Sequence, residues 1–200
     1  AFPGETSDIF RAYQVEKDRE QLTSLATSIK KSDLLLIIAP LYVDNPPASL
    51  LKVLHDLVEH HTEDLKGRGA FGIIHSGYMK PSHRAVSLSN LYQFSQAAGM
   101  NWYGGLGFGG TSPIAGEPLN QAPFTKNLKK CLEALADTLT TGALLSEEIY
   151  ALSDRKPIPL PLRLIPPILN ARLKKQLSAV ERKGFSRPYL EESEFRRESV

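Results

Sequence analysis

Two short segments of this chain combine a tyrosine with groups that can hold a flat ligand. The first, Pro40-Leu41-Tyr42-Val43-Asp44, directly follows an apolar run at 33–39. The second, Ser76-Gly77-Tyr78, directly follows an apolar run at 70–75. A tyrosine ring can form a wall for a planar molecule, and a glycine lets the backbone approach a ring closely. The chemistry to consider is therefore the binding of a flat aromatic group.

A flavin ring is one group that needs these features. It requires a wall for its face, backbone donors for its pyrimidine edge, and room near N5 for hydride delivery. Taken singly, each segment is more often a surface aromatic beside a turn, because short motifs frequently occur by chance. A third stretch, the glycine-rich segment 104–110, could likewise admit a ligand or a partner chain. Three such loops at one edge of a sheet would favour a binding site.

The first segment is placed by the strand before it and the helix after it. Because the run at 33–39 is apolar without alternation, it predicts a strand buried on both faces, as in the middle of a parallel sheet. Pro40 ends this strand, and Pro47 opens a helix at a first-turn position. Open α/β sheets bind ligands at such a loop, between the carboxyl end of a strand and the next helix.

The rest of the chain continues the alternation of strands and helices. We expect strands at 8–15 (a short edge strand), 33–39, 70–75 and 101–108, and helices at 18–31, 47–61, 82–98 and 120–141. This order predicts a parallel sheet covered by helices on both faces. Right-handed crossovers then bring the loops 40–46, 76–81 and 105–116 to one edge.

Two of the helices have recognisable ends. Asp18 is the expected N-cap of the helix at 18–31. Ser82 is the expected N-cap of the helix at 82–98, and Gly99 closes that helix as a C′ residue. On this second helix the periodicity predicts these inward-facing residues: Ala85, Leu88, Leu91, Tyr92 and Ala98.

The loop segments also resemble those of a known family, the flavodoxin-like NAD(P)H-dependent FMN reductases. Pro40 to Asp44, followed by Pro46-Pro47, resembles the flavin-contacting loop of that family. Ser76-Gly77-Tyr78 is similar to its Ser-Gly-aromatic turn, although the acidic residue that often follows is absent. Gly104 to Gly109 resembles its glycine-rich strand end, and Arg182-Lys183-Gly184 resembles its C-terminal end. The similarity extends over most of residues 8–185.

The resemblance implies a flavodoxin-like open parallel sheet and an FMN-dependent oxidoreductase. Two electrons would pass from NADH or NADPH to a quinone, a flavin or a similar small-molecule acceptor. No catalytic residue is assigned. The resemblance implies these cofactor-binding residues: Pro40, Leu41, Tyr42, Val43, Asp44, Ser76, Gly77 and Tyr78.

One departure from the family concerns the flavin phosphate. The family begins with a strand and a Ser/Thr-rich loop that holds the phosphate at a helix N-terminus. Residues 1–7 are too short for that unit and contain Pro3 and Gly4. We therefore expect the first βα unit to be missing from these 200 residues, through truncation or loss, and the affinity for FMN to be poor.

Composition limits the other function classes. The net charge of +2 gives no sign of a nucleic-acid partner, and none is expected. Cys131 is the single cysteine, which excludes an internal disulfide and fits a reducing compartment. Without a signal peptide or a bilayer-spanning apolar run, a cytoplasmic location is expected. The five histidines form no metal-binding pattern, and no metal site is predicted.

The C-terminal quarter differs from the rest. We expect a flavodoxin-like domain at 1–150 and an extension at 151–200, with a proline-rich arm and a basic helix at 168–183. The extension holds eleven Lys/Arg against six Asp/Glu. It could pack on its own domain, contact a second subunit in a homodimer, or lie on anionic lipid, and its interrupted apolar pattern favours the first two.

The sequence is also compatible with two functions other than that of an enzyme. The first is a non-enzymatic binding or interaction protein that has the flavodoxin fold without flavin. The second is a membrane-surface adaptor that acts through the basic extension.

Overall fold

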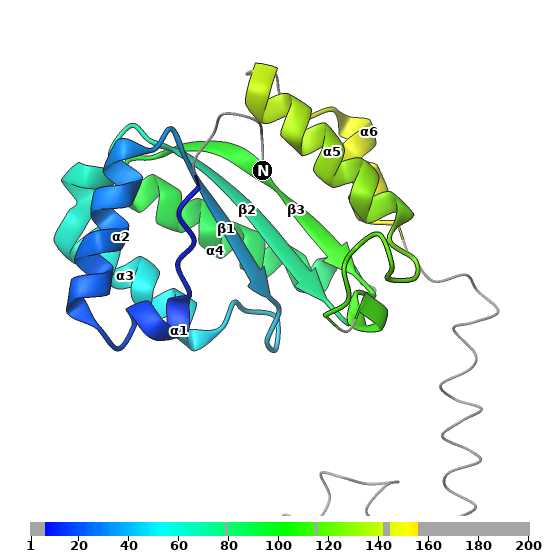
Figure 1. Ribbon diagram of the computed structural model, residues 1–200, viewed down its shortest axis with the longest axis horizontal. Coiled ribbons are helices and arrows are strands. Elements are labelled where there is room, and N and C mark those ends of the chain that lie inside the picture. The colour runs from blue at the N-terminus through cyan, green and yellow to red at the C-terminus, as the bar shows by residue number, and fades with distance from the viewer. Residues whose placement is uncertain (1–6, 79, 115, 142–144, 156–200) are drawn as a thin grey trace, which may run out of the picture. The chain divides into compact units, whose positions relative to one another are not determined.

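The described part of the chain is built on a three-stranded parallel sheet. The computed structural model describes residues 7–78, 80–114, 116–141 and 145–155. The strand order is β1-β2-β3, and Leu34 pairs with Gly69, which pairs with Asn101. The strands, shown in Figure 1, are β1 (Leu34–Pro40), β2 (Gly69–Ser76) and β3 (Asn101–Gly109).

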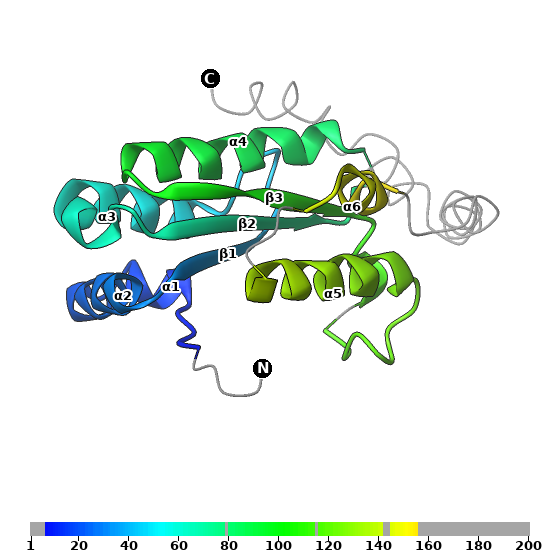
Figure 2. The same ribbon diagram turned by 90° about the horizontal axis from the view of Figure 1, so that it is seen from above.

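Helices cover both faces of this sheet, as the sequence predicted. They are α1 (Ala12–Val15), α2 (Arg19–Lys31), α3 (Ala48–Leu65), α4 (Ser82–Ala97), α5 (Lys126–Thr141) and α6 (Glu147–Ser153), with a 3-10 turn η1 (Ser112–Ile114). Helices α3 and α4 are the crossovers between successive strands. Figure 2 shows α4 and α5 on opposite sides of the sheet. The open parallel α/β fold is therefore confirmed.

Two units divide the chain, Ala1–Pro157 and Ile158–Val200, and every described residue belongs to the first. The expected proline-rich arm and basic helix lie outside the described residues, and the boundary at 150 stays a prediction. Within the described ranges, no helix is both long and apolar enough to cross a bilayer.

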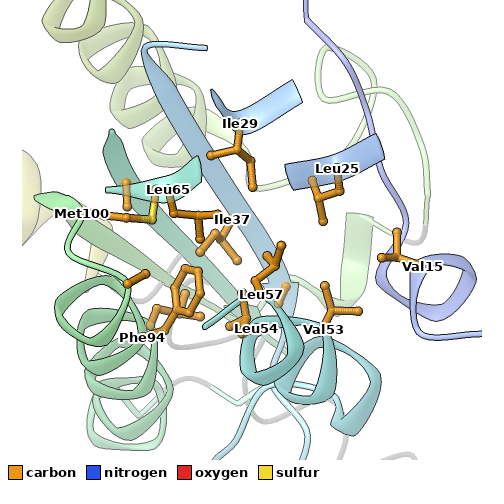
Figure 3. Close-up of a cluster of buried hydrophobic side chains, with 14 of the residues drawn as sticks. Val15, Leu25, Ile29, Ile37, Val53, Leu54, Leu57, Leu65, Phe94 and Met100 are labelled. Carbon is orange, nitrogen blue, oxygen red and sulfur yellow. The ribbon is translucent and has the colours of Figure 1, made fainter. Parts of the chain in front are cut away.

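The apolar core forms two clusters, one on each side of the sheet. The first joins α2, α3 and α4 to one face of the strands, and its buried side chains include Leu25, Ile37, Leu57 and Phe94 (Figure 3). The second joins α5 and α6 to the other face through residues such as Phe71 and Leu106. Strand β2 is buried along almost its whole length, as expected of a central strand.

The prediction that β1 is buried on both faces is wrong. Among the described residues β1 pairs only with β2, so it is an edge strand. Ile37 and Ala39 are buried in the first cluster, whereas Leu36 is 40% exposed and Ile38 is 60% exposed. A continuous apolar run shows that a strand can be buried on both faces. It does not show whether a neighbour covers the second face.

The ends of the early elements are partly as predicted. Asp18 caps α2, because its carboxylate accepts hydrogen bonds from the backbone N–H groups of Glu20 at 2.9 Å and Gln21 at 3.4 Å. The expected edge strand at 8–15 is wrong, since the helix α1 forms there. Ala12 and Val15, one helical turn apart, both pack in the first cluster, so tertiary burial overrides the loose alternation of this segment.

The later helices differ from the prediction at their ends. Helix α3 continues past the predicted end at His61, whose non-helical backbone (φ −136°, ψ 17°) marks a kink. Helix α5 starts at Lys126 and not near 120, because Phe124 has a φ of 60° and no helix can pass through it.

Helix α4 differs from the prediction at its start and in part of its buried face. Its N-cap is Pro81, and Ser82 makes no capping hydrogen bond. Ala85 is exposed and Tyr92 is 41% exposed. Arg84 and Ser87 are buried one position before Ala85 and Leu88, whereas Leu91 and Ala98 are buried as predicted. Gly99 closes the helix with a φ of 65°, as predicted.

Candidate functional site

The three predicted loops meet at the carboxyl edge of the sheet. The backbone N–H of Leu41 donates to the carbonyl of His75 at 2.8 Å and joins the ends of β1 and β2. The N–H of Thr111 donates to the carbonyl of Ser76 at 3.0 Å, and that of Gly110 to the carbonyl of Tyr78 at 3.3 Å. Segments far apart in sequence thus form one surface, as the topology predicted.

The loop after β1 is a tight two-residue turn. Tyr42 and Asn45 exchange backbone hydrogen bonds of 2.7 and 3.1 Å. Between them Val43 and Asp44 have φ values of 48° and 64°, the left-handed pair that a type I′ turn requires. Asparagine and glycine favour this conformation, whereas a β-branched valine does not. Backbone strain of about 1–3 kcal/mol at Val43 must be offset by surrounding contacts.

A polar stripe on α4, formed by His83, Ser87 and Asn90, supplies those contacts. The Nδ1 atom of His83 lies 2.5 Å from Oδ1 of Asp44. Ser87 donates from Oγ to the carbonyl of Asp44 at 3.1 Å, and Asn90 donates from Nδ2 to Oδ1 of Asn45 at 2.8 Å. Because residues at i, i+4 and i+7 share one helix face, a single side of α4 fixes the turn after β1.

His83 also contacts the loop after β2. Its ring stacks on Tyr78, with centroids 5.6 Å apart and an interplanar angle of 27°. The backbone N–H of Tyr78 donates to Oγ of Ser76 at 2.9 Å. Tyr42 and Tyr78 remain 63% and 65% exposed. One histidine therefore joins the two tyrosine-bearing loops, and both rings stay open to solvent.

A buried arginine lies beneath this surface. Arg84 is 1% exposed. Its Nη1 donates to the carbonyls of Tyr78 at 3.4 Å and Lys80 at 3.3 Å, and its Nη2 lies 3.2 Å from Oδ1 of Asp154. Its Nε has no partner within the described residues. A Cβ at Gly107 would lie 2.9 Å from that Nε, so only glycine leaves room for the guanidinium.

Packing explains several glycines of the glycine-rich strand. A Cβ at Gly105 would lie 2.7 Å from the Leu88 side chain, and the space beside Gly104 is occupied by the Tyr150 hydroxyl. The space beside Gly77 is occupied by the Ser112 side chain. These close approaches come from the protein itself. Gly109 and Gly110, by contrast, line a small cavity, so the expectation that segment 104–110 admits a ligand stays a prediction.

His75 and Cys131 lie close to the core. Burial lowers the pKa of His75, whose Nδ1 is 3.4 Å from Oγ1 of Thr111. Burial raises the pKa of the Cys131 thiol, which packs in the second cluster. Across the described ranges, no group of three or more His, Cys, Asp or Glu side chains could hold a metal ion.

The predicted binding residues divide into exposed and supporting groups. Tyr42, Val43 and Tyr78 are exposed, and Asp44 is half-exposed although His83 occupies its carboxylate. Leu41 and Ser76 are buried and face the interior. A cavity of about 20 Å³ lies nearby, lined by residues that include Thr111 and Phe124 but neither tyrosine. A ring at this edge would therefore lie on an open surface.

Sequence reasoning misses the residues that hold the loops together. It weighs His83 only as a metal ligand, and it does not single out Arg84, Ser87 or Asn90. The available signal is the spacing of His83, Ser87 and Asn90, which places three hydrogen-bonding side chains on one helix face directly after a predicted binding loop.

Comparisons with known proteins give little more. No family model and no curated protein matches the sequence. Among solved structures, the chain is similar to an NADPH-quinone reductase from P. pentosaceus, with a TM-score of 0.36 and 14% identity. The match covers 46% of this chain and 62% of that protein, so the chain spans less than two thirds of its length. This similarity is too low to assign a family or a function.

The strain at Val43 can be measured. We expect Val43→Asn to raise the free energy of unfolding by about 1 kcal/mol, because the left-handed conformation costs most L-residues about 1–2 kcal/mol and asparagine less. Val86→Asn, at an exposed position of α4, is the control and should change stability by less than about 0.5 kcal/mol. Equal effects of the two substitutions in urea unfolding would show that Val43 is unstrained.

The ion pair between Arg84 and Asp154 should contribute more to the free energy of unfolding than a surface ion pair does. Asp154→Ala leaves a buried guanidinium short of an acceptor, so we expect the free energy of unfolding to fall by about 1–3 kcal/mol. Glu148→Ala removes the exposed pair with Lys130 and should cost less than about 0.5 kcal/mol. Chemical denaturation of both variants tests this, and similar losses would contradict the role given to Arg84.

The pKa of His75 predicts a pH dependence of stability. Because burial lowers this pKa, the unfolded chain binds the proton more tightly than the folded chain. The stabilisation is complete above the unfolded pKa of about 6.5 and is lost as the pH falls below it. His75→Asn should reduce the loss of stability between about pH 7.5 and 5.5. The control His55→Asn, at a 68% exposed position, should not, and an unchanged loss in His75→Asn would refute the prediction.

Proposed function

We propose that the carboxyl edge of the sheet binds the ring of FMN and that the chain acts in an NAD(P)H-dependent oxidoreductase. The acceptor would be a quinone, a flavin or a similar small molecule, and the location cytoplasmic. The observation that carries the proposal is the position of His83, which pairs with Asp44 in one loop and stacks on Tyr78 in the other. Two exposed tyrosines are thereby presented on one surface at the place where open α/β sheets bind ligands.

The exposed residues suit a flat ring. Tyr42 and Tyr78 offer aromatic faces, and the N–H groups of Val43 and Asp44 have no hydrogen-bond partner among the described residues. These N–H groups are suitable donors to a pyrimidine edge. Leu41 and Ser76 would support the loops from beneath, since both are buried. When bound, the flavin supplies the redox chemistry, and the chain's own residues bind and orient its ring.

The phosphate of FMN has no assigned partner in this proposal. Neither tyrosine-bearing loop supplies the Ser/Thr-rich segment that would hold it. We therefore propose that the described residues recognise the ring alone, which predicts weak binding with little preference between FMN and riboflavin.

A flavin-free binding protein is the second candidate. The open surface around Tyr42 and Tyr78 favours it, because neither ring lines the nearby cavity of about 20 Å³. Ligand sites normally enclose most of their ligand. Addition of a flavin to the purified chain separates the two candidates, since only the first binds it.

Flavin titration tests the proposed function directly. We expect fluorescence quenching of both FMN and riboflavin with similar dissociation constants. Tyr42→Ala and Tyr78→Ala should each weaken binding about tenfold, because stacking a planar ring on an aromatic side chain is worth about 1–3 kcal/mol. Tyr13→Ala, at a 55% exposed tyrosine on α1, is the control and should leave binding unchanged.

Two results would overturn the flavin assignment. One is that the chain quenches the fluorescence of neither FMN nor riboflavin. The other is equal binding by all three tyrosine variants. If quenching occurs, oxidation of NADH or NADPH with a quinone acceptor then tests the enzymatic part of the proposal.

A further inference from the structure

Helix α6 is connected to the loop after β2 through a single carboxylate. Asp154 is the C-cap residue of α6, and its Oδ1 atom lies 3.2 Å from Nη2 of Arg84, which is 70 residues earlier in sequence. The Asp154 side chain is 54% exposed, whereas Arg84 is 1% exposed. A carboxylate at the surface thus neutralises a buried cation that belongs to α4.

The other end of the guanidinium contacts the loop that carries Tyr78. Nη1 of Arg84 donates to the carbonyls of Tyr78 at 3.4 Å and Lys80 at 3.3 Å. The Tyr78 carbonyl also accepts from the backbone N–H of Gly110 at 3.3 Å. All three distances exceed the usual range of about 2.7–3.2 Å. Hydrogen bonds this long are easily lost, so they depend on where the guanidinium is held.

The geometry of arginine transmits the position of Asp154 to those carbonyls. The guanidinium is planar and rigid, so an acceptor that holds Nη2 also fixes the direction in which Nη1 donates. Without Asp154 the buried cation would be unpaired, which is costly. It would then turn toward another acceptor or toward solvent, and the hydrogen bonds to Tyr78 and Lys80 would be broken or realigned.

Strand β3 leaves the arginine room to reach α6. A Cβ at Gly107 would lie 2.9 Å from Nε and 3.3 Å from Cδ of Arg84. The same strand contacts α6 at Gly104, beside the hydroxyl of Tyr150, and Tyr150 packs against the second cluster. The place of Asp154 relative to the guanidinium is therefore set by the packing of α6 on β3, independently of the ion pair.

We propose that Asp154 is a positioning residue for the surface that presents Tyr78. It orients the Arg84 guanidinium, and the guanidinium orients the backbone of the loop after β2. The inference about the loop stands on these contacts alone. Its consequence for binding rests on the proposed function, in which the Tyr78 ring is a wall for the flavin. Helix α6 then controls the affinity for a ligand that none of its residues is proposed to contact.

Nuclear magnetic resonance of the full 200-residue chain tests the positioning without any ligand. Asp154→Ala should shift the backbone amide resonances of Tyr78 and Gly110, because the Gly110 N–H and the guanidinium share the Tyr78 carbonyl. Asp154→Asn keeps an oxygen acceptor for Nη2 and should shift them less. Glu148→Ala removes another carboxylate of α6, which pairs with Lys130 at the surface, and should leave both resonances unchanged.

A destabilised variant separates positioning from a general loss of stability. Leu25→Ala opens a cavity in the first cluster beneath α2, which carries none of the hydrogen-bond partners described for Arg84. The cavity should lower the free energy of unfolding. It should nevertheless leave the amide resonances of Tyr78 and Gly110 in place.

Flavin titration measures the consequence for binding. Asp154→Ala should raise the dissociation constants of FMN and riboflavin at least about threefold, because residues of one hydrogen-bond network are energetically coupled. The increase should not exceed the change of about tenfold expected of Tyr78→Ala, because Asp154 acts through that residue. In a Tyr78→Ala background the substitution should add nothing, whereas in a Tyr42→Ala background it should act in full.

The inference and the proposed function fail in different ways. Circular dichroism establishes that each variant is folded, and Asp154→Asn replaces Asp154→Ala if the latter does not fold. Unshifted resonances of Tyr78 and Gly110 overturn the positioning, and so do equal shifts in Leu25→Ala. An equal loss of affinity with and without the Tyr78 ring overturns it as well. A chain that binds no flavin overturns the proposed function alone, and the resonances then decide the positioning.

Discussion

The carboxyl edge of this sheet depends on a buried positive charge. The guanidinium of Arg84 lies under the loop after β2 and is almost completely removed from solvent. Burying a charge is costly unless it is paired and hydrogen-bonded. Its partners are two carbonyls of that loop and the carboxylate of Asp154, which follows α6. The loop conformation, the position of α6 and the glycine at 107 are therefore linked through one side chain.

Helix α4 serves both the core and the site, which explains its composition. One side buries Leu91 and Phe94 against the sheet, and its first turns carry Arg84 and the polar stripe of His83, Ser87 and Asn90. The stripe compensates a left-handed valine in the turn after β1. A strained turn that is held by three side chains of another element presents its N–H groups in a fixed direction. Such fixed donors are what recognition of a flat ring requires.

The sequence allowed the layered architecture to be predicted but not the width of the sheet. Apolar runs at 33–39 and 70–75 indicated parallel strands, and the topology of such sheets brought their loops to one edge. The burial of β1 on both faces was predicted wrongly, because Leu36 and Ile38 have the residue types of a two-sided strand but are not covered by the described residues. The residue contacts of α4 were missed for a related reason. In its first turns the buried positions are shifted by one, so Arg84 and Ser87 are buried where Ala85 and Leu88 were expected, although Leu91 is buried as predicted. Which side chains reach across between loops is decided by tertiary packing and is not encoded in local periodicity.

The most direct test of this account is a nuclear Overhauser measurement between the rings of Tyr78 and His83. His83 joins the loops after β1 and β2, and its ring centroid lies 5.6 Å from that of Tyr78. A cross-peak between the ring protons of Tyr78 and His83 is expected in the unliganded chain. It should be lost or weakened in Asp44→Ala, which releases the histidine. Assigned ring resonances without that cross-peak would show that the two loops are held apart, and the proposed binding surface would not exist.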